Sequence, residues 1–114
     1  MEIINERKIE EKYSLVCKLV EQLIDKDFND KQFMKFKNTA VFTDLSICRK
    51  KGFLGGGSVM IFKINIHNPN EKDIINIEAR YFDKYPGNDA DRLISILKSL
   101  EKRFKNVKTK IVII

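Results

Sequence analysis

Hydrophobic residues recur at helical spacing in two stretches of this chain, one in each half. The first stretch runs from Glu6 to about Lys26, and its apolar positions are Ile9, Tyr13, Val16, Val20, Leu23 and Ile24. The second runs from Asn88 to about Lys105, and its apolar positions are Leu93, Leu97, Leu100 and Phe104. Steps of three and four residues place each set on one side of a helix, and Asn88 is a residue type that caps a first turn. We therefore predict two amphipathic helices.

Between these helices the hydrophobic spacing becomes that of β-strands. We predict strands at Thr39–Cys48, Ser58–His67 and Ile74–Phe82, because they are rich in β-branched residues or alternate apolar with polar side chains. The alternating set is Met60, Phe62, Ile64 and Ile66 in the second strand, and Ile75, Ile77, Ala79 and Tyr81 in the third. The segment Asp27–Asn38 is ambiguous, since Asp27 or Asn29 can cap a short helix while Phe33, Met34 and Phe36 can lead into a strand.

The last eight residues, VKTKIVII, are predicted to form a further strand. Its apolar residues, Ile111–Ile114, fall on both faces, which is typical of a strand inside a sheet or beneath a second layer. An exposed edge this apolar would instead favour pairing with another chain, so a homo-oligomer formed through this strand is the alternative.

Together these elements predict one α+β domain over residues 1–114. Their order is helix, three-stranded meander, helix, strand (αβββαβ), with a mixed four-stranded sheet and two packed helices. A chain of 114 residues is of the right size for a single core.

The stretch RKKGFLGGGS, residues 49–58, contains two glycines at the spacing of a phosphate-binding loop. Such a loop needs a strand before it, a helix after it and a Lys after the second glycine. In this chain Ser58 follows Gly57 and a strand comes next. We therefore interpret the glycines as a hairpin connection, with Arg49, Lys50 and Lys51 as a basic tip that can touch phosphates.

Residues for catalysis or metal binding are scarce. His67 is the single histidine, and Cys17 and Cys48 lie 31 positions apart, so no zinc ligand set or catalytic triad is expected, and no cofactor. Both cysteines are predicted to be buried free thiols in a reducing compartment. Neither a signal peptide nor a membrane span is recognisable, and we expect a cytoplasmic protein that does not contact membranes.

Positive charge is unevenly distributed over a net charge of +6. Residues 1–31, 32–72, 73–91 and 92–114 carry −2, +5, −3 and +6. In the predicted second helix Lys98, Lys102 and Lys105 fall within roughly 60° of one another, and Lys108 and Lys110 follow. Such a stripe can follow a phosphate backbone. Lysines at a helix C-terminus also complement the helix dipole, and a lysine-rich solvated surface is the plainer interpretation.

Glu78 and Arg80 share one face of the predicted third strand, in the sequence INIEARYF. Glu-x-basic on that strand, within this order of elements, resembles the core of restriction-endonuclease-like (PD-(D/E)XK) nucleases. The resemblance implies a divalent metal bound by this Glu and by an acid on the second strand, with a Lys two residues after the Glu.

This sequence departs from that pattern twice. The second strand offers Asn65 in place of an acid, and Arg80, which stays protonated, replaces the Lys. Asp73 is excluded because it lies roughly 17 Å from Glu78 along the strand and on the other face. Asp44 on the first strand is the one remaining acid considered. A charge pair on a solvated sheet face is the simpler interpretation of Glu78 and Arg80.

A second resemblance is to RWD-type interaction domains. Tyr85-Pro86 matches the start of their YPxxxP motif, but Ala90 stands at the position of the second Pro. From all these observations we expect a small non-catalytic binding protein, such as an inhibitor or accessory factor of a mobile element. Its basic surface would contact nucleic acid, a nucleoprotein or an acidic protein. The alternative is a metal-dependent nuclease-fold enzyme with a rearranged or degenerate active site.

Overall fold

The computed structural model describes residues 12–28, 32–38, 42–50, 58–68, 74–82 and 89–114. These residues form seven elements along the chain. They are α1 (Tyr13–Asp27), β1 (Gln32–Asn38), β2 (Phe42–Lys50), β3 (Ser58–His67), β4 (Ile75–Tyr81), α2 (Asp89–Arg103) and β5 (Val107–Ile113).

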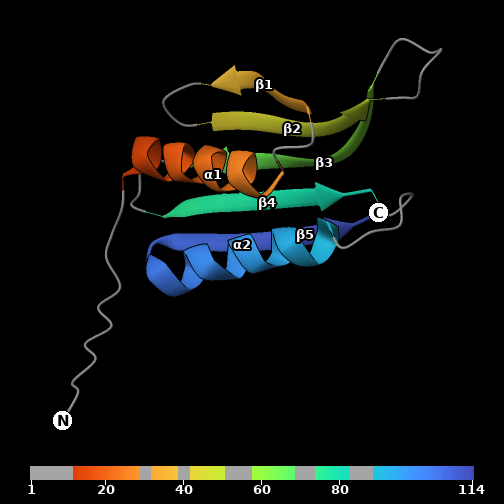
Figure 1. Cartoon of the computed structure of the whole chain (residues 1–114). Coiled ribbons are helices and arrows are strands. Elements are labelled where there is room, and N and C mark those ends of the chain that lie inside the picture. The colour runs from red at the N-terminus through yellow and green to blue at the C-terminus, as the bar shows by residue number, and fades with distance from the viewer. Residues whose placement is uncertain (1–11, 29–31, 39–41, 51–57, 69–73, 83–88) are drawn as a thin grey trace.

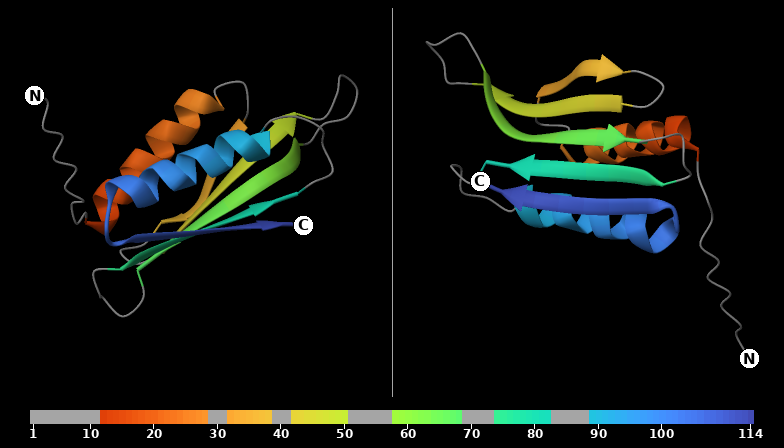
Figure 2. Two further views of the ribbon diagram at one scale, coloured as in Figure 1. Left: turned by 90° about the horizontal axis from the view of Figure 1, so that it is seen from below. Right: turned by 180° about the vertical axis from the view of Figure 1, so that it is seen from behind.

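The strands form one sheet in the order β1-β2-β3-β4-β5, and both helices lie on the same face of it (Figures 1 and 2). The first four strands pair as antiparallel neighbours. The fifth strand pairs with β4 in parallel. The chain reaches this position by the crossover through α2, because a short turn cannot connect two parallel strands. The rear view in Figure 2 shows the opposite face, which neither helix covers.

The prediction of an α+β fold with a mixed sheet and two packed helices is confirmed. The predicted order of helix, meander, helix and strand corresponds to α1, β2–β3–β4, α2 and β5. The sheet has five strands rather than four, because the ambiguous segment after α1 forms β1. The register between β1 and β2 shifts between Lys35 and Lys37. A bulge of this kind inserts an extra residue, so β1 shows no regular alternation in its sequence.

Element bounds differ from the prediction mainly at two places. The first helix begins at Tyr13 instead of Glu6, since Lys12 has extended backbone angles (φ −77°, ψ 147°) and serves as its N-cap. β2 ends at Lys50 rather than at Cys48, and residues 39–41 lie outside the described residues. The predicted cap Asn88 and apolar residue Ile9 lie outside the described residues.

The core lies between the two helices and the sheet. It is built from the predicted apolar faces, with Val16, Val20 and Ile24 from α1 and Leu93, Ile96, Leu97 and Leu100 from α2. The sheet contributes Leu45 and Ile47 from β2, Phe62, Ile64 and Ile66 from β3, and Ile75, Ile77, Ala79 and Tyr81 from β4. Cys17 and Cys48 are buried free thiols, as predicted.

A partly buried polar cluster fixes α1 to the sheet. The Tyr13 hydroxyl lies 2.6 Å from Thr43 Oγ1 and donates a hydrogen bond to the Ile66 carbonyl oxygen at 3.2 Å. Cys17 Sγ lies 3.5 Å from the same threonine oxygen. Burial raises the pKa of Tyr13 to about 12, because loss of hydration disfavours the phenolate. These contacts join α1 to β2 and β3 at one point.

The final strand is an edge strand, and the expectation that both of its faces are buried is wrong. Val107 is buried, but Lys108 and Lys110 are exposed, and Ile113 is 55% exposed. The strand lies at the end of the sheet, and because both helices lie on one face of the sheet, they cover β5 only on the side of α2 (Figure 2). The Glu101 carboxylate accepts a hydrogen bond from the Thr109 backbone N–H at 2.9 Å and so satisfies one donor of this edge. Across the described ranges, no helix has the length and apolar content needed to cross a bilayer.

Candidate functional site

The sheet face opposite the helices, which we call the uncovered face, presents polar side chains from four strands. On β4 the buried residues alternate with Asn76, Glu78 and Arg80. Successive side chains of a strand point to opposite faces, so these three point away from the helices. The strand register extends this face to Phe42 and Asp44 on β2, Lys63, Asn65 and His67 on β3, and Lys108, Lys110 and Val112 on β5.

Register places these side chains in rows that run across the strands. One row holds Phe42, His67, Asn76 and Lys108, and the next holds Asp44, Asn65, Glu78 and Lys110. In a third row Lys63 lies directly beside Arg80. Neighbouring strands lie about 4.8 Å apart, so each row brings together residues that are distant in sequence.

The candidate nuclease residues occupy the middle of this face. Arg80 Nε lies 3.4 Å from Glu78 Oε1, and their side chains are 48% and 40% exposed. An ion pair this exposed contributes little to stability. Asp44 Oδ1 accepts a hydrogen bond from Asn65 Nδ2 at 2.7 Å. Asp44 and Glu78 are two strand spacings apart, roughly 10 Å, with Asn65 between them, so the register does not bring the two carboxylates together.

No group of three or more His, Cys, Asp or Glu side chains in the described part of the chain is arranged to hold a metal ion. The excluded residue Asp73 lies outside the described residues. The described residues around Glu78 form an ion pair and an amide–carboxylate hydrogen bond, and none of them adds a converging oxygen ligand.

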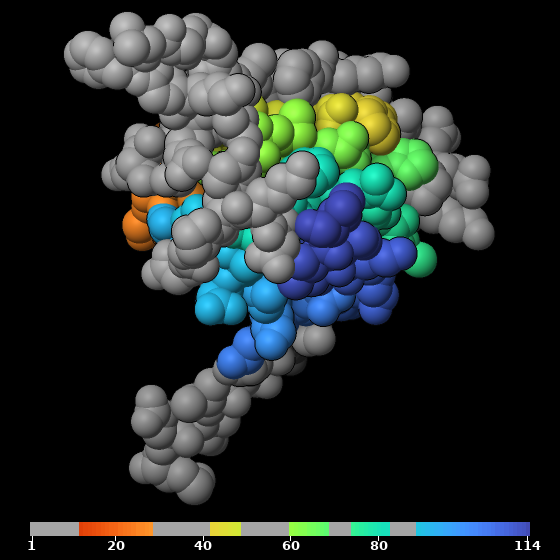
Figure 3. Space-filling model, turned by 90° about the vertical axis from the view of Figure 1, so that its right-hand side faces the viewer, coloured from red at the N-terminus to blue at the C-terminus, as the bar shows by residue number. Residues whose placement is uncertain are grey.

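The lysines predicted on the second helix and final strand are exposed and lie on neighbouring elements. Lys98, Lys102 and Lys105 are exposed on or just after α2, and Lys108 and Lys110 are exposed on β5. Figure 3 shows α2 and β5, in lighter and darker blue, side by side on the surface of the molecule. We call these five lysines the α2–β5 basic surface. The acid within this segment, Glu101, is held by the Thr109 N–H.

The basic tip of the hairpin is separate from that surface. Arg49 and Lys50 end β2, where they pair with Val59 and Ser58 of β3, and Lys51 lies outside the described residues. Two strands stand between β2 and β5, a distance of roughly 14 Å across the sheet. These residues also lie at the opposite end of the sheet from Lys108, because Val107 pairs with Ile75 at the start of β4. The structure does not unite the two predicted basic groups.

His67, predicted to flank a turn, ends β3 on the uncovered face. Its ring centroid lies 5.9 Å from that of Phe42, with an angle of 68° between the ring planes. This edge-to-face geometry is one that aromatic pairs prefer. His67 is exposed and Phe42 is partly exposed, so the pair presents aromatic surface beside the polar rows.

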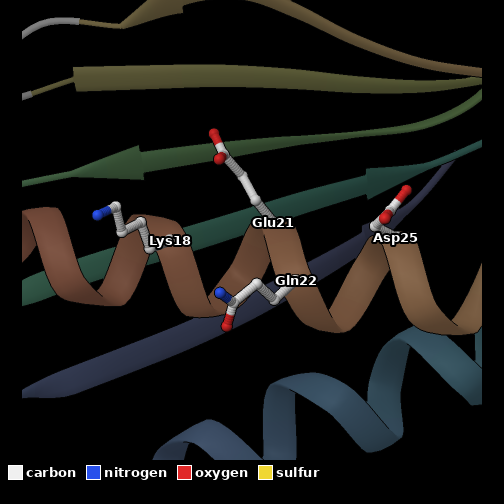
Figure 4. Close-up of a pocket in the computed structure, with 4 residues that line it drawn as sticks. All are labelled: Lys18, Glu21, Gln22 and Asp25. Carbon is white, nitrogen blue, oxygen red and sulfur yellow. The ribbon is translucent and has the colours of Figure 1, made fainter.

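One further hollow, of about 370 Å³, lies beside α1 (Figure 4). Its described lining residues are Lys18, Glu21, Gln22 and Asp25. They all come from one helix, and in Figure 4 Gln22 points away from the other three. Ligand sites generally converge groups from several elements around apolar walls, and this hollow does not show that arrangement.

Several residues of the uncovered face were not identified from the sequence as site residues, namely Phe42, Lys63, Asn65, His67 and Asn76. Alternation in Ser58–His67 does predict that Lys63, Asn65 and His67 share a face. It does not tell whether a helix covers that face, because covering depends on how the strands and crossovers are arranged.

No protein-family model, curated protein or solved structure matches this chain at a significant level. The resemblances to restriction-endonuclease-like nucleases and to RWD-type domains therefore stay predictions from the residues, and Tyr85-Pro86 lies outside the described residues.

Proposed function

We propose that this protein is a non-catalytic nucleic-acid-binding protein that contacts phosphate groups through the α2–β5 basic surface. The observation that carries the proposal is the exposure of all five lysines on two adjacent elements. Exposed lysines that neutralise phosphates release condensed counterions, and this release favours binding.

The charge balance around these lysines supports the proposal. Within the described ranges, Lys98, Lys102, Lys108 and Lys110 form no ion pair. The two aspartates of α2, Asp89 and Asp91, lie in its first turn, at the end of the helix remote from Lys102. Asp89 also pairs with Arg92 at 3.3 Å. These four lysines therefore keep their positive charge available for an external anion.

The helix dipole does not account for the whole set of lysines. Cations in the last turn of a helix are favoured near its C-terminus, which explains Lys102 and contributes to Lys105. The same dipole does not extend to Lys108 and Lys110, which lie on a strand.

The proposal is tested by measuring affinity for a labelled mixed-sequence oligonucleotide, single-stranded and duplex, at several salt concentrations. For about five phosphate contacts, log K should fall with log salt at a slope of roughly −4.5 on duplex and −3.5 on a single strand. Changing Lys98, Lys102 and Lys105 together to Ala should reduce either slope by roughly two to three units.

A matched control uses three lysines of the other helix. Lys12, Lys18 and Lys26 are exposed at or on α1, and changing them to Ala alters the net charge by the same amount. We expect this control to keep most of the salt slope and both variants to keep the wild-type melting temperature. Equal effects of the two triple variants would show that net charge alone is responsible. Wild-type affinity weaker than about 10⁻⁴ M at physiological salt would overturn the proposal in favour of an acidic protein partner.

A further inference from the structure

The uncovered face combines positive charge, an exposed imidazole beside a partly exposed phenyl ring, and side-chain amides within three adjacent rows. We infer that this face binds single-stranded nucleic acid, with a base stacked on His67 beside Phe42 and with phosphates at Lys63, Arg80, Lys108 and Lys110. This inference rests on the proposed function and specifies both the class of nucleic acid and the second half of its binding surface.

The acids of the uncovered face are already engaged with neighbours on the same face. Asp44 accepts the Asn65 amide at 2.7 Å, and Glu78 pairs with Arg80 at 3.4 Å. By contrast, Lys63, Lys108 and Lys110 form no ion pair with any other described residue. Among the described side chains, four cations and two carboxylates give this face a formal excess of positive charge, which complements a phosphate backbone.

Two cations stand next to each other without a shared counterion. Lys63 and Arg80 are register partners on β3 and β4, so their Cβ atoms are separated by about 5 Å. Like charges directly opposite each other destabilise a sheet. Of the described carboxylates in the next row, Glu78 pairs with Arg80 and Asp44 accepts the Asn65 amide, and neither forms an ion pair with Lys63. A phosphate group placed between Lys63 and Arg80 would relieve this repulsion.

The aromatic pair provides a stacking surface for unpaired bases, which a single strand has and a duplex does not. Unpaired bases stack on exposed aromatic side chains, whereas the bases of a duplex are stacked on one another inside it. His67 lies in the same row as Asn76 and Lys108, roughly two strand spacings or 10 Å from the lysine. A base on His67 would thus lie near amides that can hydrogen-bond its edge and near a phosphate ligand.

The two parts of the surface meet at β5, the edge strand that follows α2. Lys108 and Lys110 belong both to the α2–β5 basic surface and to the uncovered face. A strand that begins on α2 can therefore pass over the edge of the sheet at β5 and continue across β4 to β3.

The test compares His67 variants by fluorescence anisotropy with a labelled single strand and its duplex. His67→Ala should weaken single-strand binding by roughly 5- to 150-fold, the range expected for one lost stack, and leave duplex binding unchanged. His67→Phe should restore most of the affinity because it retains the ring. Lys63→Ala should reduce the single-strand salt slope by about 0.7, whereas the control Lys18→Ala on α1 should not change it.

A direct readout is available because the chain has one histidine. Its imidazole proton signals should move upfield when the single strand is added and should stay in place with the duplex. If His67→Ala and Lys63→Ala leave single-strand affinity unchanged while the α2 triple variant still weakens it, this inference is overturned and the proposed function stands. Tighter binding of duplex than of single strand would likewise overturn this inference and leave the proposed function standing. No binding of either nucleic acid would overturn the inference and the proposed function together.

Discussion

The hydrogen-bond cluster around Tyr13 gives the sharpest prediction for stability. Tyr13→Phe removes one hydroxyl and keeps the ring, so both contacts of that hydroxyl, with Thr43 and with Ile66, are lost. A typical intramolecular hydrogen bond contributes about 0.5–1.5 kcal/mol net. Because Tyr13 is partly exposed and water can replace some of the contact, we expect a loss of about 1–2 kcal/mol. For a chain of this length that corresponds to a decrease in Tm of about 4–8 °C.

A double-mutant cycle with Thr43→Val isolates the shared bond. The two hydroxyls lie 2.6 Å apart, so the losses of the single variants should not add, and the coupling energy should be about 0.5–1.5 kcal/mol. Urea unfolding followed by circular dichroism measures each free energy of unfolding. A coupling energy of zero, or a Tyr13→Phe variant as stable as the wild type, would refute the view that this cluster holds α1 on the sheet.

The same residue makes stability depend on alkaline pH. Burial raises the pKa of Tyr13 to about 12, above the value of about 10 in an unfolded chain. The folded state therefore keeps a proton that the unfolded state loses, and stability falls as pH rises from about 10 to about 12. This part of the alkaline loss should be absent in Tyr13→Phe, when both proteins are compared in the same pH series.

Three further predictions concern other parts of the molecule. Ser46 Oγ is buried and has no hydrogen-bond partner among the described residues, so Ser46→Ala should leave the melting temperature unchanged or raise it. A decrease of several degrees would contradict the view that this hydroxyl is unsatisfied. No second carboxylate converges with Glu78 in the described part of the chain, so no cleavage of DNA or RNA is expected with Mg²⁺ or Mn²⁺. Cleavage by the wild type that disappears in the Glu78→Gln variant would contradict this prediction and show that the protein is an enzyme. Deleting residues 107–114 should unfold or aggregate the domain because it removes the parallel partner of β4, whereas Ile113→Ser, at an exposed position, should leave melting nearly unchanged.

The parts of the fold that could be predicted from sequence are those whose signal is local. Alternation over Ser58–His67 gives the bounds of β3 as they are in the structure, and alternation in β4 gives its buried face. The apolar side of α2 follows from helical spacing. β1 could not be assigned because its bulge between Lys35 and Lys37 breaks the two-residue period on which strand prediction depends.

The position of β5 and the uncovered face depend on non-local information. The sequence of Ile111–Ile114 shows that the strand is apolar, but its place in the sheet depends on the crossover through α2. Likewise, the sequence identifies Glu78 and Arg80 as neighbours on one face. Their proximity to Lys63 and Lys110 arises only from the pairing of three strands. The sequence could therefore predict which lysines are candidate phosphate contacts, but not the rows of side chains that surround them on neighbouring strands.

The lysines of the α2–β5 basic surface all belong to one continuous segment, Asp89–Ile113, which is joined to the sheet by a single strand pairing with β4. Proteins open locally in contiguous units of this kind, at a lower free energy than global unfolding. A nucleic acid that binds only the closed segment would raise the free energy of its opening by about 2.7 kcal/mol at a concentration 100 times the Kd. Slower amide hydrogen exchange in β5 and α2 would then accompany binding. The ligand would thus stabilise, against local unfolding, the same segment to which it binds.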